Sequence, residues 1–162
     1  MRLVMMGVTG SGKTVLGQAL ARRLGSPFLD ADDVHTPQAR AQMAAGVGLT
    51  DADRAPWLAR LRGELLARPD VVLACSALRR AYRDALRVGG VRFLFLNVPE
   101  DVLRARLAAR SGHYAGAALL PSQFATLEPP GPDEADVLTL DVTAADTPAD
   151  LARRALAALG AA

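Results

Sequence analysis

The chain has 162 residues, of which 51% are hydrophobic and 22% are charged, and its formal net charge is +2 at pH 7. This length predicts a single domain over residues 1–162 with a sizeable core, and the small net charge argues against a nucleic-acid platform. The single cysteine excludes a disulfide framework and is typical of a reducing, cytoplasmic compartment. No apolar run approaches the roughly 18 residues of a membrane-spanning helix, so we expect no membrane association.

Short apolar runs alternate with stretches of helical periodicity along the chain. The runs expected as strands are residues 3–6, 26–32, 71–76, 91–98 and 136–142. The stretches expected as helices are residues 13–24, 37–45, 51–68, 77–88, 99–110, a short helix near 121–127, and 147–159. This alternation predicts an α/β fold in which a five-stranded parallel sheet carries helices on both faces. Ligands of such sheets bind at the carboxyl ends of the strands.

The motif GVTGSGKT, at residues 7–14, matches the phosphate-binding pattern G-x-x-x-x-G-K-[ST] in full. Its backbone N–H groups and the helix that follows are suited to cradle phosphate, while the Lys13 ammonium reaches the β- and γ-phosphates. The Thr14 hydroxyl is the expected Mg²⁺ ligand. Every other basic residue of the chain is arginine, so the only lysine occupies the position where a compact ammonium is required. The residues predicted to bind ATP here are Gly7, Val8, Thr9, Gly10, Ser11, Gly12, Lys13 and Thr14.

The sequence lacks the motifs that are typical of other nucleotide-hydrolysing classes. A GTPase needs a guanine-reading N-K-x-D motif, but Asn97 is followed by Val-Pro-Glu. A motor or transport ATPase usually has an apolar strand that ends in aspartate, whereas VVLACS ends in Cys-Ser. A small P-loop kinase remains, with ATP and Mg²⁺ as its cofactors.

Two acids at the end of the second expected strand are the candidates for the acceptor side. A carboxylate can hold an acceptor hydroxyl and take its proton, and we assign this catalytic role to Asp32. Asp30 is expected to contact a Mg²⁺-bound water. His35 is a candidate hydrogen-bonding partner of the substrate. Arg54 lies in the first turn of a helix, where a cation is unfavourable, which suggests that it holds an anion.

Further candidates follow the third expected strand and the fifth expected helix. Ser76, Arg79 and Arg83 are predicted to contact the substrate, the alternative being a solvated basic face paired with Asp84. A lid is expected over approximately residues 106–124, because a small kinase must exclude water from ATP. Its candidate residues are Arg106 and Arg110 for ATP, with Arg110 also catalytic, and His113 and Gln123 for the substrate.

Seven sequence blocks together resemble the gluconokinase family in order and spacing. They are GVTGSGKT, FLDADDVH, LTDADRAPWL, CSALRRAYRD, RSGHY, SQFATLEPP and DEADVL. The resemblance implies ATP-dependent phosphorylation of D-gluconate to 6-phosphogluconate on an adenylate-kinase-like or shikimate-kinase-like fold with a mobile lid, usually as a homodimer. It also implies that Asp32 holds the 6-hydroxyl, and that His35, Arg54, Arg79 and His113 surround the sugar acid.

This chain departs from the family pattern in two places. The family more often has lysine where Arg79 and Arg80 stand, and bulkier residues where this chain has the small residues 115–118. Two other functions stay open. One is another small-molecule kinase, such as a shikimate kinase; the other is a non-catalytic ATP-sensing module, against which the intact Lys13 and Asp32 argue.

Overall fold

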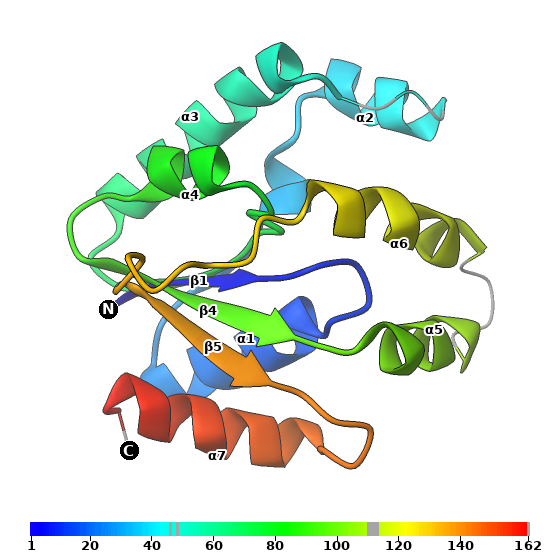
Figure 1. The fold of residues 1–162 in the computed structure, drawn as a ribbon. Helices are drawn as coiled ribbons and strands as arrows, with labels where there is room; N and C mark the ends of the chain where they lie inside the picture. Colours follow the sequence, from blue (N-terminus) through cyan, green and yellow to red (C-terminus); the bar gives the residue numbers. More distant parts are fainter. Residues whose placement is uncertain (46, 48, 110–113, 162) are drawn as a thin grey trace.

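The computed structural model describes residues 1–45, 47, 49–109 and 114–161. Within this part of the chain, five parallel strands form one sheet in the order β2-β3-β1-β4-β5 (Figure 1). The strands are β1 (Arg2–Met6), β2 (Phe28–Asp30), β3 (Val71–Ala74), β4 (Val91–Asn97) and β5 (Val137–Asp141). The α-helices are α1 (Lys13–Leu24), α2 (Pro37–Ala44), α3 (Asp51–Ala67), α4 (Arg80–Leu86), α5 (Glu100–Ala109), α6 (Tyr114–Thr126) and α7 (Pro148–Leu159). The predicted α/β class with a parallel sheet is confirmed.

Side chains of successive strand residues enter two separate cores, one on each face of the sheet. In β1, Leu3 and Met5 belong to one core, and Val4 and Met6 belong to the other. All four are fully buried, as the central strand of a doubly covered parallel sheet requires. In Figure 1, α1 and α7 cover one face of the sheet, and α3 and α4 cover the other.

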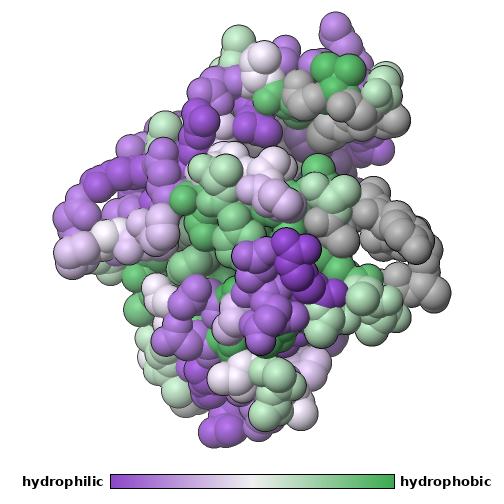
Figure 2. Space-filling model, turned by 45° about the vertical axis from the view of Figure 1, so that its right-hand side comes forward, coloured by the Kyte–Doolittle hydropathy of each residue, from purple (hydrophilic) through white to green (hydrophobic). Residues whose placement is uncertain are grey.

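Both edge strands of the sheet leave apolar side chains half-buried, Phe28 and Leu29 in β2 among them. β5 is an edge strand, and its Val137 and Leu138 are only partly buried. Figure 2 shows that much of the hydrophobic surface on the viewed face gathers near its centre, with hydrophilic residues above and below it. No helix among the described residues is long and apolar enough to cross a membrane.

Three elements differ from their predicted bounds. β2 ends at Asp30, and a short 3₁₀ helix, η1 (Ala31–Val34), follows it. α4 begins at Arg80 rather than at residue 77, because Ala77 has a left-handed φ of 45° that a helix cannot include. α6 is longer than the short helix expected near 121–127, since the alanine and leucine residues before Pro121 are strong helix formers.

The order of the strands places the phosphate-binding motif at the centre of the sheet. β1 lies between β3 and β4. The strands that follow β1 first, β2 and β3, lie on one side of it, and the later strands, β4 and β5, lie on the other. Crevices for ligands form outside the carboxyl ends of the strands at such a switch point. The loop from Gly7 to Gly12 leaves β1 there and leads into α1.

Candidate active site

An open cavity of about 780 Å³ lies at the carboxyl ends of β1, β2 and β3. It unites the phosphate-binding loop with the two acids after β2 and with the end of β3. The lining residues are Thr9, Gly10, Gly12, Lys13, Thr14, Val15, Asp30, Asp32, Asp33, His35, Arg40, Ala74, Cys75, Ser76, Leu119 and Gln123. Residues from three strand ends and from α6 are therefore brought to one place, as the sequence predicted for a parallel sheet.

The phosphate-binding loop has the backbone that its glycines permit. Gly7 has φ 145° and Gly12 has φ 98°, which side chains with a Cβ rarely adopt. A Cβ at Gly7 would lie 2.9 Å from the Ser11 hydroxyl and 3.1 Å from the Leu96 carbonyl oxygen, whereas Gly12 faces open space. The loop is thus close-packed against β4 on one side and open at the start of α1.

The Lys13 side chain curls back over its own loop. Its ammonium donates hydrogen bonds of 2.9 Å to the carbonyl oxygens of Gly7 and Val8. Burial lowers the pKa of Lys13, and the nearby carboxylates Asp32 and Asp30 act in the opposite direction. A partly buried ammonium close to carboxylates, at the edge of the cavity, has the charge and the position needed to meet phosphate oxygens.

Oxygen atoms suited to a hard cation meet beside this lysine. The Thr14 hydroxyl donates to a carboxylate oxygen of Asp30 at 3.1 Å, and the other oxygen of Asp30 accepts the backbone N–H of Asp32, also at 3.1 Å. Mg²⁺ is usually held by one or two protein oxygens together with substrate phosphates and water, so this pair fits such an ion. Among the described residues, no cluster of three or more acids, histidines or cysteines offers a self-sufficient metal site.

Asp32 lies in the 3₁₀ helix η1, and His35 directly follows this helix. Both residues line the same cavity. The Asp32 side chain is 91% exposed, while the His35 side chain is only 7% exposed. Partial desolvation in the cavity and, after it, the charge of Asp30 raise the pKa of Asp32 above its ordinary value, while His35 and Lys13 act in the opposite direction. Burial lowers the pKa of His35, with Arg40 and Arg54 adding to this effect and Asp32 opposing it. An ionisable carboxylate therefore stands in the cavity beside an imidazole that is neutral at pH 7.

Two of the predicted arginines belong to one polar cluster at the start of α3 and α4. Arg54 donates to the Tyr82 hydroxyl at 2.8 Å, and this hydroxyl donates to the Asp51 carboxylate at 2.6 Å. Arg79 donates to the other oxygen of Asp51 at 2.9 Å. The guanidinium groups lie 5.5 Å and 5.9 Å from the centre of the Tyr82 ring. Arg54 and Arg79 do not line the cavity itself, but Arg54 is close enough to His35 to influence its pKa.

Three further predicted residues contact the phosphate-binding loop. The Ser76 carbonyl oxygen accepts the Gly7 N–H at 3.2 Å, which joins the end of β3 to the loop. The Gln123 side chain, from α6, accepts the Thr9 N–H at 2.6 Å. Arg106, from α5, donates to the Ser11 carbonyl oxygen at 3.4 Å. Both helices of the predicted lid segment therefore touch the loop that is expected to hold ATP.

The predicted substrate contact of Arg83 is wrong. Its side chain is buried and is held by Glu134 through hydrogen bonds of 2.7 Å and 2.6 Å. It also donates to the carbonyl oxygens of Ala77, Leu78 and Glu128. With its donors engaged in the interior, Arg83 has no means to reach a ligand in the cavity.

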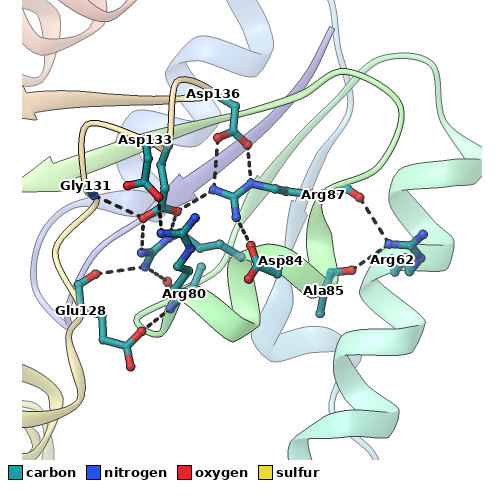
Figure 3. Close-up of polar contacts among 12 residues, drawn as sticks. Arg62, Arg80, Asp84, Ala85, Arg87, Glu128, Gly131, Asp133 and Asp136 are labelled. Atoms are coloured by element: carbon teal, nitrogen blue, oxygen red, sulfur yellow. Dashed lines mark hydrogen bonds and ion pairs between the residues drawn. The ribbon is translucent and has the colours of Figure 1, made fainter.

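Arg83 belongs to an ion network that joins α4 to the segment before β5 (Figure 3). In Figure 3, Arg87 points toward Asp136 and Asp84, and it also binds Glu134. Arg80 binds Asp133 nearer the surface. The basic face of this helix is thus mostly paired within the protein. The alternative from the sequence, a solvated face paired with Asp84, does not hold for Arg83 either, because Arg83 is buried against Glu134 and Asp84 pairs with Arg87.

The predictions on Arg110 and His113 fall outside the described residues. Conversely, sequence reasoning assigned no role in the site to Arg40, Asp51, Trp57 or Tyr82. Arg40 lines the cavity and donates to the Asp33 carbonyl oxygen at 2.7 Å. No sequence signal marked it, because it lies in a helix away from every strand end. Cys75 also lines the cavity, but burial raises the pKa of its thiol to about 12, so it is no nucleophile.

Comparison with known proteins gives concordant relatives. A family model described as an AAA domain matches residues 3–130. A gluconokinase from Gluconobacter oxydans (strain 621H) is 48% identical over 138 residues, which cover 82% of this chain and 78% of that protein. The crystal structure of a gluconokinase from Sinorhizobium meliloti 1021 matches with a TM-score of 0.88 and 44% identity, over 98% of this chain and 91% of that one. A shikimate kinase from Bacteroides thetaiotaomicron matches with a TM-score of 0.68 at 22% identity, covering 99% of this chain and 98% of that one, a likeness of fold alone.

Proposed function

Because the chain belongs to the gluconokinase family of P-loop kinases, we propose that it transfers the γ-phosphoryl group of ATP to D-gluconate and releases 6-phospho-D-gluconate. One observation carries this proposal at the level of the site: the phosphate-binding loop and the Asp30–Asp32 pair face one cavity of about 780 Å³. A phosphate donor and a hydroxyl acceptor can therefore bind there next to each other, with no layer of water between them.

Each group in the cavity has a role that follows from its surroundings. Asp32, ionised and open to the cavity, holds the acceptor hydroxyl and accepts its proton as the new O–P bond forms. The Lys13 ammonium leaves its loop carbonyls for the β- and γ-phosphates and offsets the charge that builds up there. Thr14 and Asp30 would hold Mg²⁺, directly and through water, and this ion would neutralise the phosphate charge during transfer.

Recognition of an acidic acceptor is supported by the cluster around Tyr82. Arg79 binds the Asp51 carboxylate, whereas Arg54 donates to the neutral Tyr82 hydroxyl and has Asp51 and Asp53 close to it. Arg54 is close enough to His35, which lines the cavity, to lower the pKa of its imidazole. We propose that the gluconate carboxylate binds near Arg54 while its far hydroxyl reaches Asp32.

Four properties of the whole protein belong to the same proposal. Residues 1–162 act as one kinase domain, and the segment of approximately residues 106–124 closes over ATP, for which the contacts of Arg106 and Gln123 with the loop give support. The protein works as a homodimer in the cytoplasm. Light scattering of the purified chain tests the dimer: a mass of about twice 17.0 kDa is expected.

The function is tested by measuring ADP release from Mg-ATP with gluconate, with other sugar acids, with shikimate, and without an acceptor. Release with gluconate alone, matched by an equal amount of 6-phosphogluconate, is the expected result. Lys13→Ala should abolish this release without unfolding the protein, as judged by circular dichroism. Release with shikimate but not with gluconate would identify a different small-molecule kinase, and ATP binding with no acceptor-dependent release would point to a sensing module.

A further inference from the structure

Asp32 and His35 are spaced so that one oxygen atom, lying to the side of the line that joins them, can hydrogen-bond to both. The distance between Asp32 Oδ1 and His35 Nε2 is 3.9 Å, which is too long for a direct hydrogen bond. An oxygen atom placed about 2.8 Å from each of them fits between the two groups and has normal hydrogen-bond lengths on both sides. Because Asp32 is open to the cavity and His35 lines it, a hydroxyl can enter this position from the cavity.

The surroundings of His35 determine which of its nitrogens carries the proton. Nδ1 is buried and has no hydrogen-bond partner among the described residues. A buried N–H without an acceptor costs more than an unused lone pair on a neutral ring, so we assign the proton to Nε2. This nitrogen is the one that lies toward Asp32. Burial lowers the pKa of the ring, Arg40 and Arg54 act in the same direction, and Asp32 opposes them.

Trp57 holds the ring in this orientation. The two rings stack with their centroids 4.5 Å apart and an interplanar angle of 6°. The indole N–H of Trp57 donates to the carbonyl oxygen of Ala31, the residue before Asp32, at 2.9 Å. A single side chain of α3 therefore fixes both the plane of His35 and the backbone that carries Asp32.

We propose that His35 orients the acceptor hydroxyl, and that Trp57 is the positioning residue that holds His35. The Nε2–H group donates a hydrogen bond to the acceptor oxygen, whose own proton points to Asp32. As the O–P bond to the acceptor forms and the P–O bond to ADP breaks, the hydroxyl proton moves to the Asp32 carboxylate. His35 keeps its proton throughout. This inference rests on the proposed function, which supplies the acceptor hydroxyl.

Three variants at position 35 separate the two ring nitrogens. Glutamine can place an amide N–H where Nε2 lies, asparagine can place one only near Nδ1, and alanine places none. We expect His35→Asn and His35→Ala each to lower kcat for gluconate about tenfold or more, and His35→Gln to stay within about threefold of the unchanged protein. The KM for ATP should not change in any of them.

Equal kcat values for the glutamine and asparagine variants would overturn the assignment of His35, and so would wild-type kcat in the alanine variant. The unchanged protein, measured in the same assay, tests the proposed function separately. If it phosphorylates a different hydroxy acid, the proposed function fails, and the same variants measured on that acceptor still test His35.

The role of Trp57 is tested with Trp57→Phe, which keeps an aromatic ring for the stack but loses the indole N–H, and Trp57→Leu, which loses both. We expect kcat to fall further in the leucine variant, with the KM for ATP unchanged. Both variants lose the hydrogen bond to Ala31, so they differ from each other only in the stack on His35. In a His35→Ala background the kcat values of Trp57→Phe and Trp57→Leu should therefore be equal, because no imidazole remains to be held. A lower kcat for the leucine variant than for the phenylalanine variant in that background would overturn the positioning role. If the leucine variant does not fold, Trp57→Met, which also lacks a ring, takes its place.

Discussion

Asp30 and Asp32 are two residues apart, yet the structure gives them different surroundings. Asp30 accepts hydrogen bonds from the Thr14 hydroxyl and from the Asp32 N–H, so both of its oxygens are engaged. Asp32 accepts no hydrogen bond in the structure's described part and stands 91% exposed in the cavity. These surroundings fit the sequence-based division of roles, in which Asp30 serves the metal and Asp32 serves the acceptor.

Asp32→Asn should lower kcat for gluconate about 10²–10⁴-fold, because an amide cannot accept the hydroxyl proton. The side chain keeps its size and the residues assigned to ATP are unaltered, so the KM for ATP should stay the same. Steady-state kinetics with both substrates checks this expectation. Wild-type kcat in Asp32→Asn would exclude Asp32 as the base.

The raised pKa of Asp32 makes the stability of the fold depend on pH. The folded protein binds the Asp32 proton more tightly than the unfolded chain does, so at pH 7 the ionised carboxylate disfavours the folded state. Asp32→Asn removes this cost, and we expect its thermal midpoint at pH 7 to be equal to or above that of the unchanged protein. At a pH well below the ordinary carboxyl pKa the difference should vanish. A midpoint that falls at pH 7 would show that the site does not strain this carboxylate.

At the level of elements, the capped N-terminal end of α3 carries residues of the candidate site. Thr50 caps α3 through a reciprocal pair of hydrogen bonds with Asp53. The first two turns of the helix then carry Asp51, Arg54 and Trp57, which the proposals place around the acceptor. α7 begins with the same arrangement, Thr147 with Asp150, but it packs on the other face of the sheet.

These two caps make a matched pair of variants. Thr50→Ala and Thr147→Ala should each lower the free energy of unfolding by about 1 kcal/mol, since each removes one capping box. Only Thr50→Ala should also raise the KM for gluconate, because only α3 carries the acceptor side of the site. Urea unfolding and acceptor kinetics on both variants check this. An equal rise in the gluconate KM for Thr147→Ala would mean that the effect comes from stability alone.

At the scale of the whole molecule, a buried ion network connects distant parts of the chain. Glu134 lies in the segment before β5, and its side chain is 2% exposed. It accepts from Arg83 and Arg87 of the α4 region, about fifty residues earlier in the sequence. These hydrogen bonds lower its pKa from the ordinary 4.5 to about 2. The network thereby ties the segment that follows α6 to the face of the sheet covered by α3 and α4.

Glu134→Gln should lower the free energy of unfolding by about 3–5 kcal/mol, because it leaves the buried Arg83 without its counter-charge. Asp133→Asn is the matched control: it breaks the neighbouring ion pair with Arg80, which is exposed to solvent, and should change stability little. Thermal or urea unfolding measures both. Similar losses of unfolding free energy in the two variants would show that the buried Arg83–Glu134 pair stabilises the fold no more than the exposed Arg80–Asp133 pair.

The same network predicts an acid limit for the fold. Because the folded pKa of Glu134 lies below its unfolded value, its contribution to stability is present above pH 4.5 and is lost as the pH falls from about 4.5 toward about 2. The thermal midpoint of the unchanged protein should fall through this window. The midpoint of Glu134→Gln should fall less steeply there.

The sequence by itself determined the features whose signals are local. A glycine-rich loop between a strand and a helix is visible in eight consecutive residues, and alternation of apolar runs with helical periodicity is enough to predict a parallel sheet with acids at its edge. The differences at α4 and α6 are local as well, but they depended on the left-handed backbone of Ala77 and on the helix-forming residues before Pro121, which hydrophobic periodicity does not reveal.

Only the tertiary structure decided which polar residues are free to act. Periodicity placed Arg79 and Arg83 on one helix face, but it could not show that Glu134, 51 residues away from Arg83, neutralises one of them and leaves the other beside Tyr82. Likewise, the stack of His35 on Trp57 joins residues 22 positions apart. Partners of this kind meet because the sheet brings separate segments of the chain together. The sequence around a charged or aromatic residue does not indicate which distant residue it will contact.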